Sequence, residues 1–265
     1  MTDELLYPDL TYRVRGLAFK VHGALKGGHP ERVYEEALCG ALDRDGIAYR
    51  RQPQIHVCYK GKQVGEYYPD LLLADGKVLL ELKATPAILP LHKAQTLSYL
   101  AAAQAELGLL LNFGAPSMQI ERLPNFVANR KPFIWNPTPA PDLLYPETTD
   151  AVLSALHEIH HELGPGFLSQ IYRRAVRIEF LLRQMNVEYL KQLPIRFETQ
   201  QIDVAPVRLF LVEQRLLVAV AALSETTAPH TEKMRWAMQE TGCQLGLIAN
   251  FHPGKLRVTF LRTSA

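Results

Sequence analysis

Two carboxylates and a lysine in the first half of this 265-residue chain have the spacing of a metal-dependent hydrolytic site. Glu81 and Lys83 lie two positions apart in an apolar run, so in a strand their side chains point to the same face. Asp70 precedes the dipeptide Asp75-Gly76, which predicts a tight turn. That turn would fold the two segments together and bring Asp70 alongside Glu81.

Such a group suggests phosphodiester chemistry. Two adjacent carboxylates repel each other, and the pKa of one rises unless a cation joins them. Carboxylate oxygens and water suit Mg²⁺, with Mn²⁺ as an alternative. The ion would polarise a phosphodiester and activate water, and Lys83 would orient that water or stabilise the developing charge. An ordinary surface ion pair on a hairpin remains the alternative, because the acid-x-Lys pattern is common.

The spacing of apolar residues predicts the helices and strands that position these side chains. Leu17, Val21 and Leu25 have helical spacing, and Pro30 suits the first turn of a second helix. After these two helices the pattern predicts a three-stranded meander, a helix and a buried strand. The predicted ranges are helices over 11–26, 30–43 and 91–104 and strands over 54–60, 63–73, 77–83 and 107–112.

The chain repeats itself at an offset of 138 positions, with a local two-residue slip near residue 187. The matched pairs include His22 and His160, Gly28 and Gly166, Tyr34 and Tyr172, His92 and His230, and Asn112 and Asn250. The second copy predicts helices near 150–163, 167–185 and 229–242 and strands near 193–222 and 244–250. We therefore expect two tandem α/β domains, each a mixed sheet flanked by helices.

The domain boundaries follow from a proline-rich segment between the copies. The expected organisation is a first domain over residues 1–128, a linker over 129–147 and a second domain over 148–265. Proline is unfavourable inside a helix or a central strand, so we expect this segment to be extended. Phe133, Trp135 and Tyr145 would anchor it.

Several motifs occur in the order found in a known group. They are Gly28-x-x-Glu31-x-x-Tyr34, Tyr68-Pro69-Asp70, Glu81-Leu82-Lys83, His92-Lys93-Ala94-Gln95 and Leu111-Asn112-Phe113-Gly114. This set resembles the GxxExxY family of prokaryotic proteins, within the PD-(D/E)xK nuclease superfamily. The resemblance implies a restriction-endonuclease-like fold.

The same resemblance implies roles for individual residues. Asp70 and Glu81 would be metal ligands and Lys83 the catalytic lysine. Glu31 would be an additional acid for the metal and for catalysis, and Gln95 a polar helix residue facing the site. The chain departs from the family's usual Leu-Gly-Pro-Gly turn, which here reads Leu25-Lys26-Gly27-Gly28.

The second copy keeps that turn as Leu163-Gly164-Pro165-Gly166 but loses the proposed chemistry. The positions of Glu31, Asp70, Glu81, Lys83 and Gln95 hold Ser169, Arg208, Ala219, Ala221 and Lys233. An arginine in place of a ligand carboxylate would repel a divalent cation. We expect a catalytically silent copy that forms a pseudo-dimer with the first, in a monomer or in a homodimer.

Further residues are candidates for contact with nucleic acid. Tyr34 and His92 lie within the motifs of the first copy. Arg173, Arg174 and Arg177 lie on one predicted helix, where they would contact phosphates or form a solvated or docking face. A separate motif, His157-Glu158-Ile159-His160-His161, matches a zinc-protease pattern, but a helix-ending turn follows it and no third ligand is evident.

Composition sets the remaining expectations. The formal net charge is +2, so any basic face must be local. The three cysteines are far apart, which argues against a disulfide framework. Neither a membrane span nor a signal peptide is visible, so we expect a cytoplasmic protein. The leading hypothesis is a Mg²⁺- or Mn²⁺-dependent nuclease acting on DNA, or on RNA. The alternative is a non-catalytic regulatory protein that binds nucleic acid or protein and carries a vestigial site.

Overall fold

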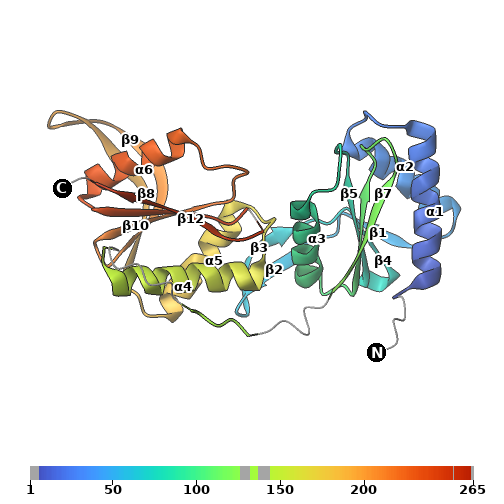
Figure 1. Cartoon of the computed structure of the whole chain (residues 1–265), viewed down its shortest axis with the longest axis horizontal. Helices are drawn as coiled ribbons and strands as arrows, with labels where there is room; N and C mark the ends of the chain where they lie inside the picture. The colour runs from blue at the N-terminus through green and yellow to red at the C-terminus, as the bar shows by residue number, and fades with distance from the viewer. Residues whose placement is uncertain (1–5, 126–131, 137–143, 253, 264–265) are drawn as a thin grey trace. The chain divides into compact units, whose positions relative to one another are not determined.

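The computed structural model describes residues 6–125, 132–136, 144–252 and 254–263 (Figure 1). The chain divides into two compact units, Met1–Lys131 and Pro132–Ala265. Each unit contains two helices, a mixed five-stranded sheet and a third helix, as the repeat predicts. Within the described residues, no helix is long and apolar enough to cross a membrane.

The first unit is built around a sheet with the strand order β1-β4-β5-β6-β7. Strands β5 and β6 are parallel and are connected through α3, while all other neighbours are antiparallel. The helices are α1 (Pro8–Leu25), α2 (Glu31–Arg44) and α3 (Pro90–Ala103), and the sheet strands are β1 (Tyr49–Arg51), β4 (Leu71–Leu73), β5 (Val78–Lys83), β6 (Leu107–Asn112) and β7 (Gln119–Pro124).

Alternation along β5 decides which side chains reach each layer. Leu80 and Leu82 belong to the core cluster beneath α1 and α2, whereas Leu79 packs with Leu100 of α3 on the opposite face. Figure 1 shows α3 on one side of this sheet and α1 and α2 on the other. Because both faces are covered, β5 is an apolar run, and its polar residues come only at its end.

The predicted strand over 63–73 is wrong as a single element. It is divided into β3 (Lys62–Tyr67), which pairs only with β2 (Ile55–Tyr59), and β4, which enters the main sheet. Pro69 lacks the amide that a central strand requires, and Asp70 lies in a bend. Strands β1 and β7 were not predicted, because each is a short, half-exposed edge strand without an apolar run.

The second unit repeats the topology, with the strand order β12-β11-β10-β9-β8 and a parallel pair β10–β11. Its hairpin β8–β9 stays continuous where the first unit divides into separate strands, and it has register shifts instead. Its elements are α4 (Pro146–Leu163), α5 (Ser169–Leu182), β8 (Val187–Phe197), β9 (Gln200–Val212), β10 (Leu216–Ala221), α6 (Ala228–Thr241), β11 (Leu245–Asn250) and β12 (Arg257–Arg262).

Of the predicted linker, residues 129–131 and 137–143 lie outside the described residues. In the described part, aromatic residues of the segment contact the second unit, as expected from the sequence. The indole Nε1 of Trp135 donates a hydrogen bond to Asp150 of α4 at 2.9 Å, and Phe133 packs against the His161 ring. Tyr145 precedes α4 and donates a hydrogen bond to Gln244 at 3.1 Å. These contacts attach residues 133 and 135 to the second unit.

Candidate metal-dependent site in the first unit

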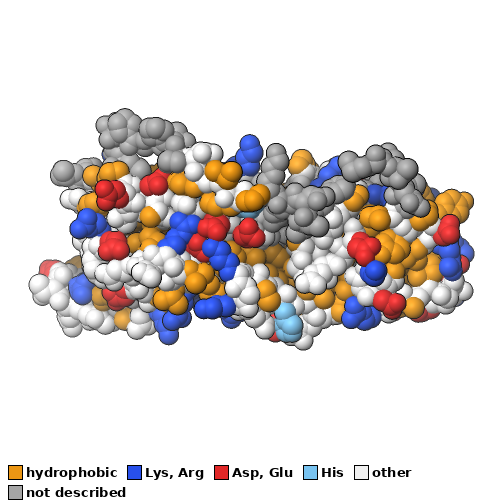
Figure 2. All heavy atoms as spheres, turned by 90° about the horizontal axis from the view of Figure 1, so that it is seen from below, with side chains coloured by type: hydrophobic (Ala, Val, Ile, Leu, Met, Phe, Trp, Pro, Cys, Tyr) orange, Lys and Arg blue, Asp and Glu red, His pale blue; other side chains and the backbone are white. Residues whose placement is uncertain are grey.

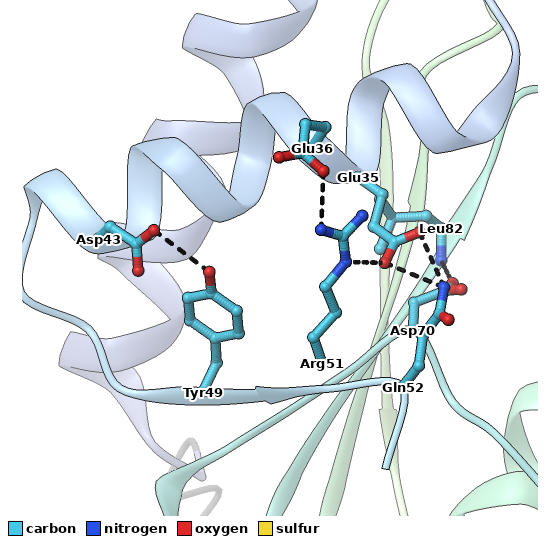
Figure 3. Close-up of polar contacts among 8 residues, drawn as sticks. All are labelled: Glu35, Glu36, Asp43, Tyr49, Arg51, Gln52, Asp70 and Leu82. Atoms are coloured by element: carbon cyan, nitrogen blue, oxygen red, sulfur yellow. Dashed lines mark hydrogen bonds and ion pairs between the residues drawn. The ribbon is translucent and has the colours of Figure 1, made fainter.

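Asp70 lies at the junction between the small β2–β3 sheet and the main sheet. Leu71 pairs with Leu80 in the antiparallel register, so the next residue outward, Asp70, lies beside Glu81. Its carboxylate Oδ2 accepts a hydrogen bond from the backbone N–H of Leu82 at 2.7 Å (Figure 3). The bend therefore places the acid where the sequence analysis expected it, although not within a strand.

Glu81 and Lys83 project from the end of β5, on the face away from Leu80 and Leu82. The ammonium Nζ of Lys83 donates hydrogen bonds to Glu81 Oε1 and to the carbonyl oxygen of Leu82, both at 2.8 Å. These side chains are largely buried, with 17% of the Lys83 side chain and 9% of the Glu81 side chain exposed. A cation is thus already held between a carboxylate and a carbonyl oxygen.

Tyr67 completes the surroundings of Glu81, although no pattern in the sequence indicates this role. Its hydroxyl donates a hydrogen bond to Glu81 Oε2 at 2.8 Å. Its ring stacks on Tyr99 of α3, with ring centroids 3.8 Å apart. Burial and the Glu81 charge raise the pKa of Tyr67, so the phenol keeps its proton and remains a donor. Only the folded chain reveals this pairing, because Tyr67 ends a strand of the separate small sheet.

Glu31 is the first residue of α2, and it approaches the same site from the helix side. Its carboxylate accepts a hydrogen bond from the backbone of Ala84, the residue after Lys83. Burial raises the pKa of Glu31, Lys83 lowers it, and Glu81 raises it again. Glu31 therefore belongs to the same electrostatic group as the two β5 residues.

The charges of this group act on one another. Burial, followed by the charge of Glu81, raises the pKa of Asp70 to about 8. Burial by itself lowers the pKa of Lys83, but the charges of Glu81, Glu31 and Asp70 outweigh it, so the net shift is upward. Three carboxyl groups thus share one lysine, and a further cation at the site would favour their ionised forms.

Gln95 and His92 lie on one face of α3, together with Tyr99. Their spacing of three and four residues places Gln95 between the other two, and Gln95 is half-buried. Burial and the Lys83 charge lower the pKa of His92, so its ring lies within the field of the site. Its Nδ1 accepts the Leu89 N–H at 3.3 Å, and His230 accepts the Thr227 N–H in the same way at 3.2 Å.

A second layer of polar residues, also missed from the sequence, supports Asp70 (Figure 3). The buried carboxylate of Glu35 accepts hydrogen bonds from Arg51 at 2.7 Å and from the Gln52 amide at 3.2 Å. The backbone N–H of Gln52 donates to the Asp70 carbonyl at 2.9 Å. Glu35 lies on the buried face of α2 among apolar residues. An acidic residue at such a position is rarely buried without a partner, and this pattern could have identified Glu35 as a functional candidate from the sequence.

The structure contradicts the expectation that Tyr34 contacts nucleic acid. Tyr34 is fully buried, and its hydroxyl donates to the Lys26 carbonyl at 2.7 Å. Its ring stacks on Phe113. Tyr172 of the second unit makes the matching bond to the Gly164 carbonyl, also at 2.7 Å, and stacks on Phe251. Tyr34 therefore holds the turn that precedes α2.

Glu31, Asp70 and Glu81 do not form a closed ligand set in this conformation. Among the described residues, no group of three or more His, Cys, Asp and Glu side chains could hold a metal ion by itself. In this conformation one Glu81 oxygen accepts a hydrogen bond from Tyr67 and the other from Lys83. The available oxygen donors still suit a hard divalent cation, which keeps several water ligands and needs few protein ones.

The zinc-protease interpretation of residues 157–161 is not supported. Glu158 forms an ion pair with Arg183 at 2.6 Å. The His157 ring packs against Trp135 and the His161 ring against Phe133. Burial lowers the pKa of His157. The motif is part of the helix surface to which residues 133 and 135 attach.

The second unit shows what replaces the site. Ser169 Oγ accepts a hydrogen bond from the Ala222 N–H at 2.8 Å, which is the bond that Glu31 takes from Ala84 in the first unit. Ala219 and Ala221 line a cavity of about 200 Å³ together with apolar side chains, His230 and Lys233. The scaffold is retained there without the carboxylates, and the ammonium comes from Lys233 of α6, which donates a hydrogen bond to the Pro206 carbonyl at 2.7 Å.

Comparison with known proteins finds the two units separately. The family model described as the PD-(D/E)XK nuclease superfamily matches residues 8–123 and, a second time, residues 146–263. These two segments cover most of the chain and correspond to the two units of the fold. No curated protein matches the chain.

Proposed function

The chain belongs to the PD-(D/E)XK nuclease superfamily, and from that membership we propose that its first copy hydrolyses phosphodiester bonds of DNA with Mg²⁺ or Mn²⁺, while its second copy is catalytically silent. One observation carries the proposal. The Lys83 ammonium is bound by Glu81 and the Leu82 carbonyl, directly beside Asp70. Oxygen atoms that bind the ammonium of Lys83 can also bind a divalent metal ion.

The residues that would hold the ion are Asp70, Glu81 and the carbonyl of Leu82, with Glu31 acting directly or through water. A bound divalent ion polarises a phosphodiester and lowers the pKa of a coordinated water. The donor set is neutral oxygen and carboxylate, which favours Mg²⁺ or Mn²⁺ over softer metals. Asp70 must lose its proton for this role, since burial and Glu81 hold its pKa near 8.

Lys83 has two roles in this proposal. Without the ion, its ammonium neutralises Glu81. If a divalent ion were held by these oxygens, the Lys83 ammonium would be available to orient the attacking water or to stabilise the developing pentavalent phosphate. An ammonium aimed at developing charge in a buried site stabilises the transition state much more than it would in water.

Glu31 and Gln95 act on the water and the substrate. A carboxylate whose pKa is raised is a better proton acceptor, so Glu31 is suited to take a proton from the attacking water. Gln95 offers an amide that can orient that water or a phosphate oxygen from the α3 side. The narrower GxxExxY assignment and the choice of DNA over RNA stay predictions.

A cleavage assay tests this function. Supercoiled plasmid, single-stranded DNA and RNA are incubated with Mg²⁺ or Mn²⁺ and with wild type, Asp70→Asn or Lys83→Ala. Asp203→Asn, an exposed acid of β9, is the matched control. We expect cleavage by the wild type and the control and none by the two site variants. Equal cleavage by all four proteins would refute the proposal.

Calorimetric titration with Mn²⁺ separates this function from the non-catalytic alternative. Binding that is present in the wild type and lost in Asp70→Asn supports a metal site. A protein that binds nucleic acid equally well with and without metal, and cleaves none, would be the regulatory protein with a vestigial site.

A further inference from the structure

The second unit contains a pocket of about 320 Å³ between α5 and the β8–β9 hairpin. Four of its seven lining residues are arginines. The lining residues are Gln170, Arg173, Arg174, Arg177, Tyr189, Arg208 and Phe210. Arg174, Arg177 and Arg208 are solvent-exposed, so a ligand can reach the pocket from the surface.

The residues that line this pocket include four arginines and no acidic side chain. Among the described residues, Arg173, Arg177 and Arg208 form no ion pair with a carboxylate. Burial lowers the pKa of Arg173. The interaction with Tyr189 raises this pKa, and the nearby charge of Arg208 lowers it. On the face drawn in Figure 2, basic and acidic side chains lie interspersed. The pocket is thus a local basic site in a chain of net charge +2.

The same positions in the first unit form the acidic layer behind Asp70. Arg173 and Arg174 replace Glu35 and Glu36, which hold Arg51 there. Arg208 replaces Asp70 itself. Loss of catalysis alone accounts for small neutral residues such as the alanines at 219 and 221. It does not account for arginines gathered around one pocket in place of acids.

The backbone at Arg208 is also unusual. Its φ of 57° is left-handed, and it lies in a bulge where β9 has an extra residue opposite β8. A non-glycine residue in this conformation costs on the order of 1 kcal/mol. Bulges redirect side chains, and this one turns Arg208 toward Arg173 despite their repulsion. Backbone strain of this kind is often found at functional sites.

We propose that this arginine pocket binds a backbone phosphate of the nucleic acid. Guanidinium groups match phosphate oxygens in shape and charge, and several of them around one hollow favour a phosphate over a carboxylate ligand. The choice of a nucleic-acid phosphate rests on the proposed function. A phosphate on a free small molecule shares the chemistry and is separated from it by experiment.

The test measures binding of the full-length chain to a short fluorescein-labelled DNA duplex by fluorescence anisotropy, in EDTA. The variant is the double substitution Arg177→Gln/Arg208→Gln. The matched control is Arg235→Gln, an exposed arginine of α6. We expect the Kd to rise about tenfold in the double variant and less than about twofold in the control, with the slope of log K against log salt reduced by roughly two. Circular dichroism checks that the variants fold.

Equal DNA affinity of the double variant and the control would overturn the proposal. A second arm measures the thermal shift caused by pyrophosphate. If pyrophosphate stabilises the wild type but not the double variant, while DNA affinity stays unchanged, the ligand is a free phosphorylated molecule and the nucleic-acid assignment is wrong. The binding assay needs no cleavage, so failure of catalysis in the first copy leaves its outcome readable.

Discussion

Tyr34 and Tyr172 occupy equivalent positions in the two units and make the same contacts, whereas Asp70 and Arg208 are equivalent in position and opposite in charge. The tyrosine hydroxyls each bond the carbonyl that ends the preceding helix, and their rings stack on Phe113 and Phe251. A contact made in both units belongs to the shared scaffold, because it does not depend on Asp70, Glu81 and Lys83, which the second unit lacks. A residue present in one unit only is where function should be sought.

The largest expected difference between the two units is in DNA cleavage. Lys83→Ala should reduce DNA cleavage at least about 100-fold, because it removes the charge aimed at the transition state. Ser169→Ala, at the position equivalent to Glu31, should change the cleavage rate less than about twofold. Single-turnover cleavage measured with saturating protein separates the rate from binding. A comparable loss in both variants would mean that the second copy is not silent.

Metal affinity should depend steeply on pH in the first copy alone. Since burial and Glu81 raise the pKa of Asp70 to about 8, the acid must release a proton before it binds an ion. The association constant for Mn²⁺ should therefore rise close to tenfold per pH unit below about 8 and then level off. Calorimetry in buffers of different ionisation enthalpy measures the released proton. A pH-independent affinity would exclude Asp70 as a ligand.

Stability of the metal-free protein should fall as pH rises through the same range. The native state keeps the Asp70 proton up to about pH 8, while the unfolded chain releases it near the ordinary value of 3.8. Across this window the unfolded state binds fewer protons, so the free energy of unfolding decreases, by up to about 1.4 kcal/mol per pH unit for this group. Glu31, whose pKa is also raised, acts in the same direction.

Denaturant unfolding of wild type and Asp70→Asn at several pH values measures this dependence. The variant cannot ionise at position 70, and its amide oxygen can still accept the Leu82 N–H. Its stability should therefore vary less with pH and exceed that of the wild type near pH 8. Parallel curves for the two proteins would contradict the assignment.

The tyrosines should behave alike in both units. Tyr34→Phe and Tyr172→Phe each remove a buried hydroxyl and leave a carbonyl without its donor, so each should lower the free energy of unfolding by about 1–2 kcal/mol. Neither substitution should alter DNA affinity measured by anisotropy. A selective loss of affinity in Tyr34→Phe would restore this residue as a nucleic-acid contact.

The smallest effect concerns the turn in which the two copies differ. Lys26 has φ 61° and ψ −166°, and the equivalent Gly164 has nearly the same angles. Only glycine adopts that region without strain. Lys26→Gly should therefore stabilise the protein by about 1 kcal/mol in thermal unfolding, and Gly164→Lys should destabilise it by a similar amount. A destabilised Lys26→Gly variant would show that the lysine side chain contributes a contact that offsets the strain.

The sequence was sufficient for the duplicated α/β fold, because helical periodicity and buried strands leave strong patterns. It also placed Glu81 and Lys83 on one strand face and Asp70 nearby, since alternation and a tight turn are local properties. It did not show that Asp70 lies in a bend. The division of residues 63–73 between two sheets depends on pairing partners far along the chain.

The residues around the site were harder to predict for the same reason. Tyr67 reaches Glu81 from another sheet, and Glu35 is buried by an arginine and a glutamine from β1 and its end. The arginine pocket requires the bulge that turns Arg208 toward α5. These arrangements are tertiary, and a linear pattern of residue types does not encode their distances.

The contact between Lys83 and the two oxygens of Glu81 and Leu82 has a consequence for how such a protein behaves when ions are scarce. When a chelator removes divalent ions, Lys83 still neutralises the Glu81 carboxylate, so the buried charge does not destabilise the surrounding strands. Removal of divalent ions should then leave the protein folded, and any cleavage activity lost on chelation should return when the ion is added back.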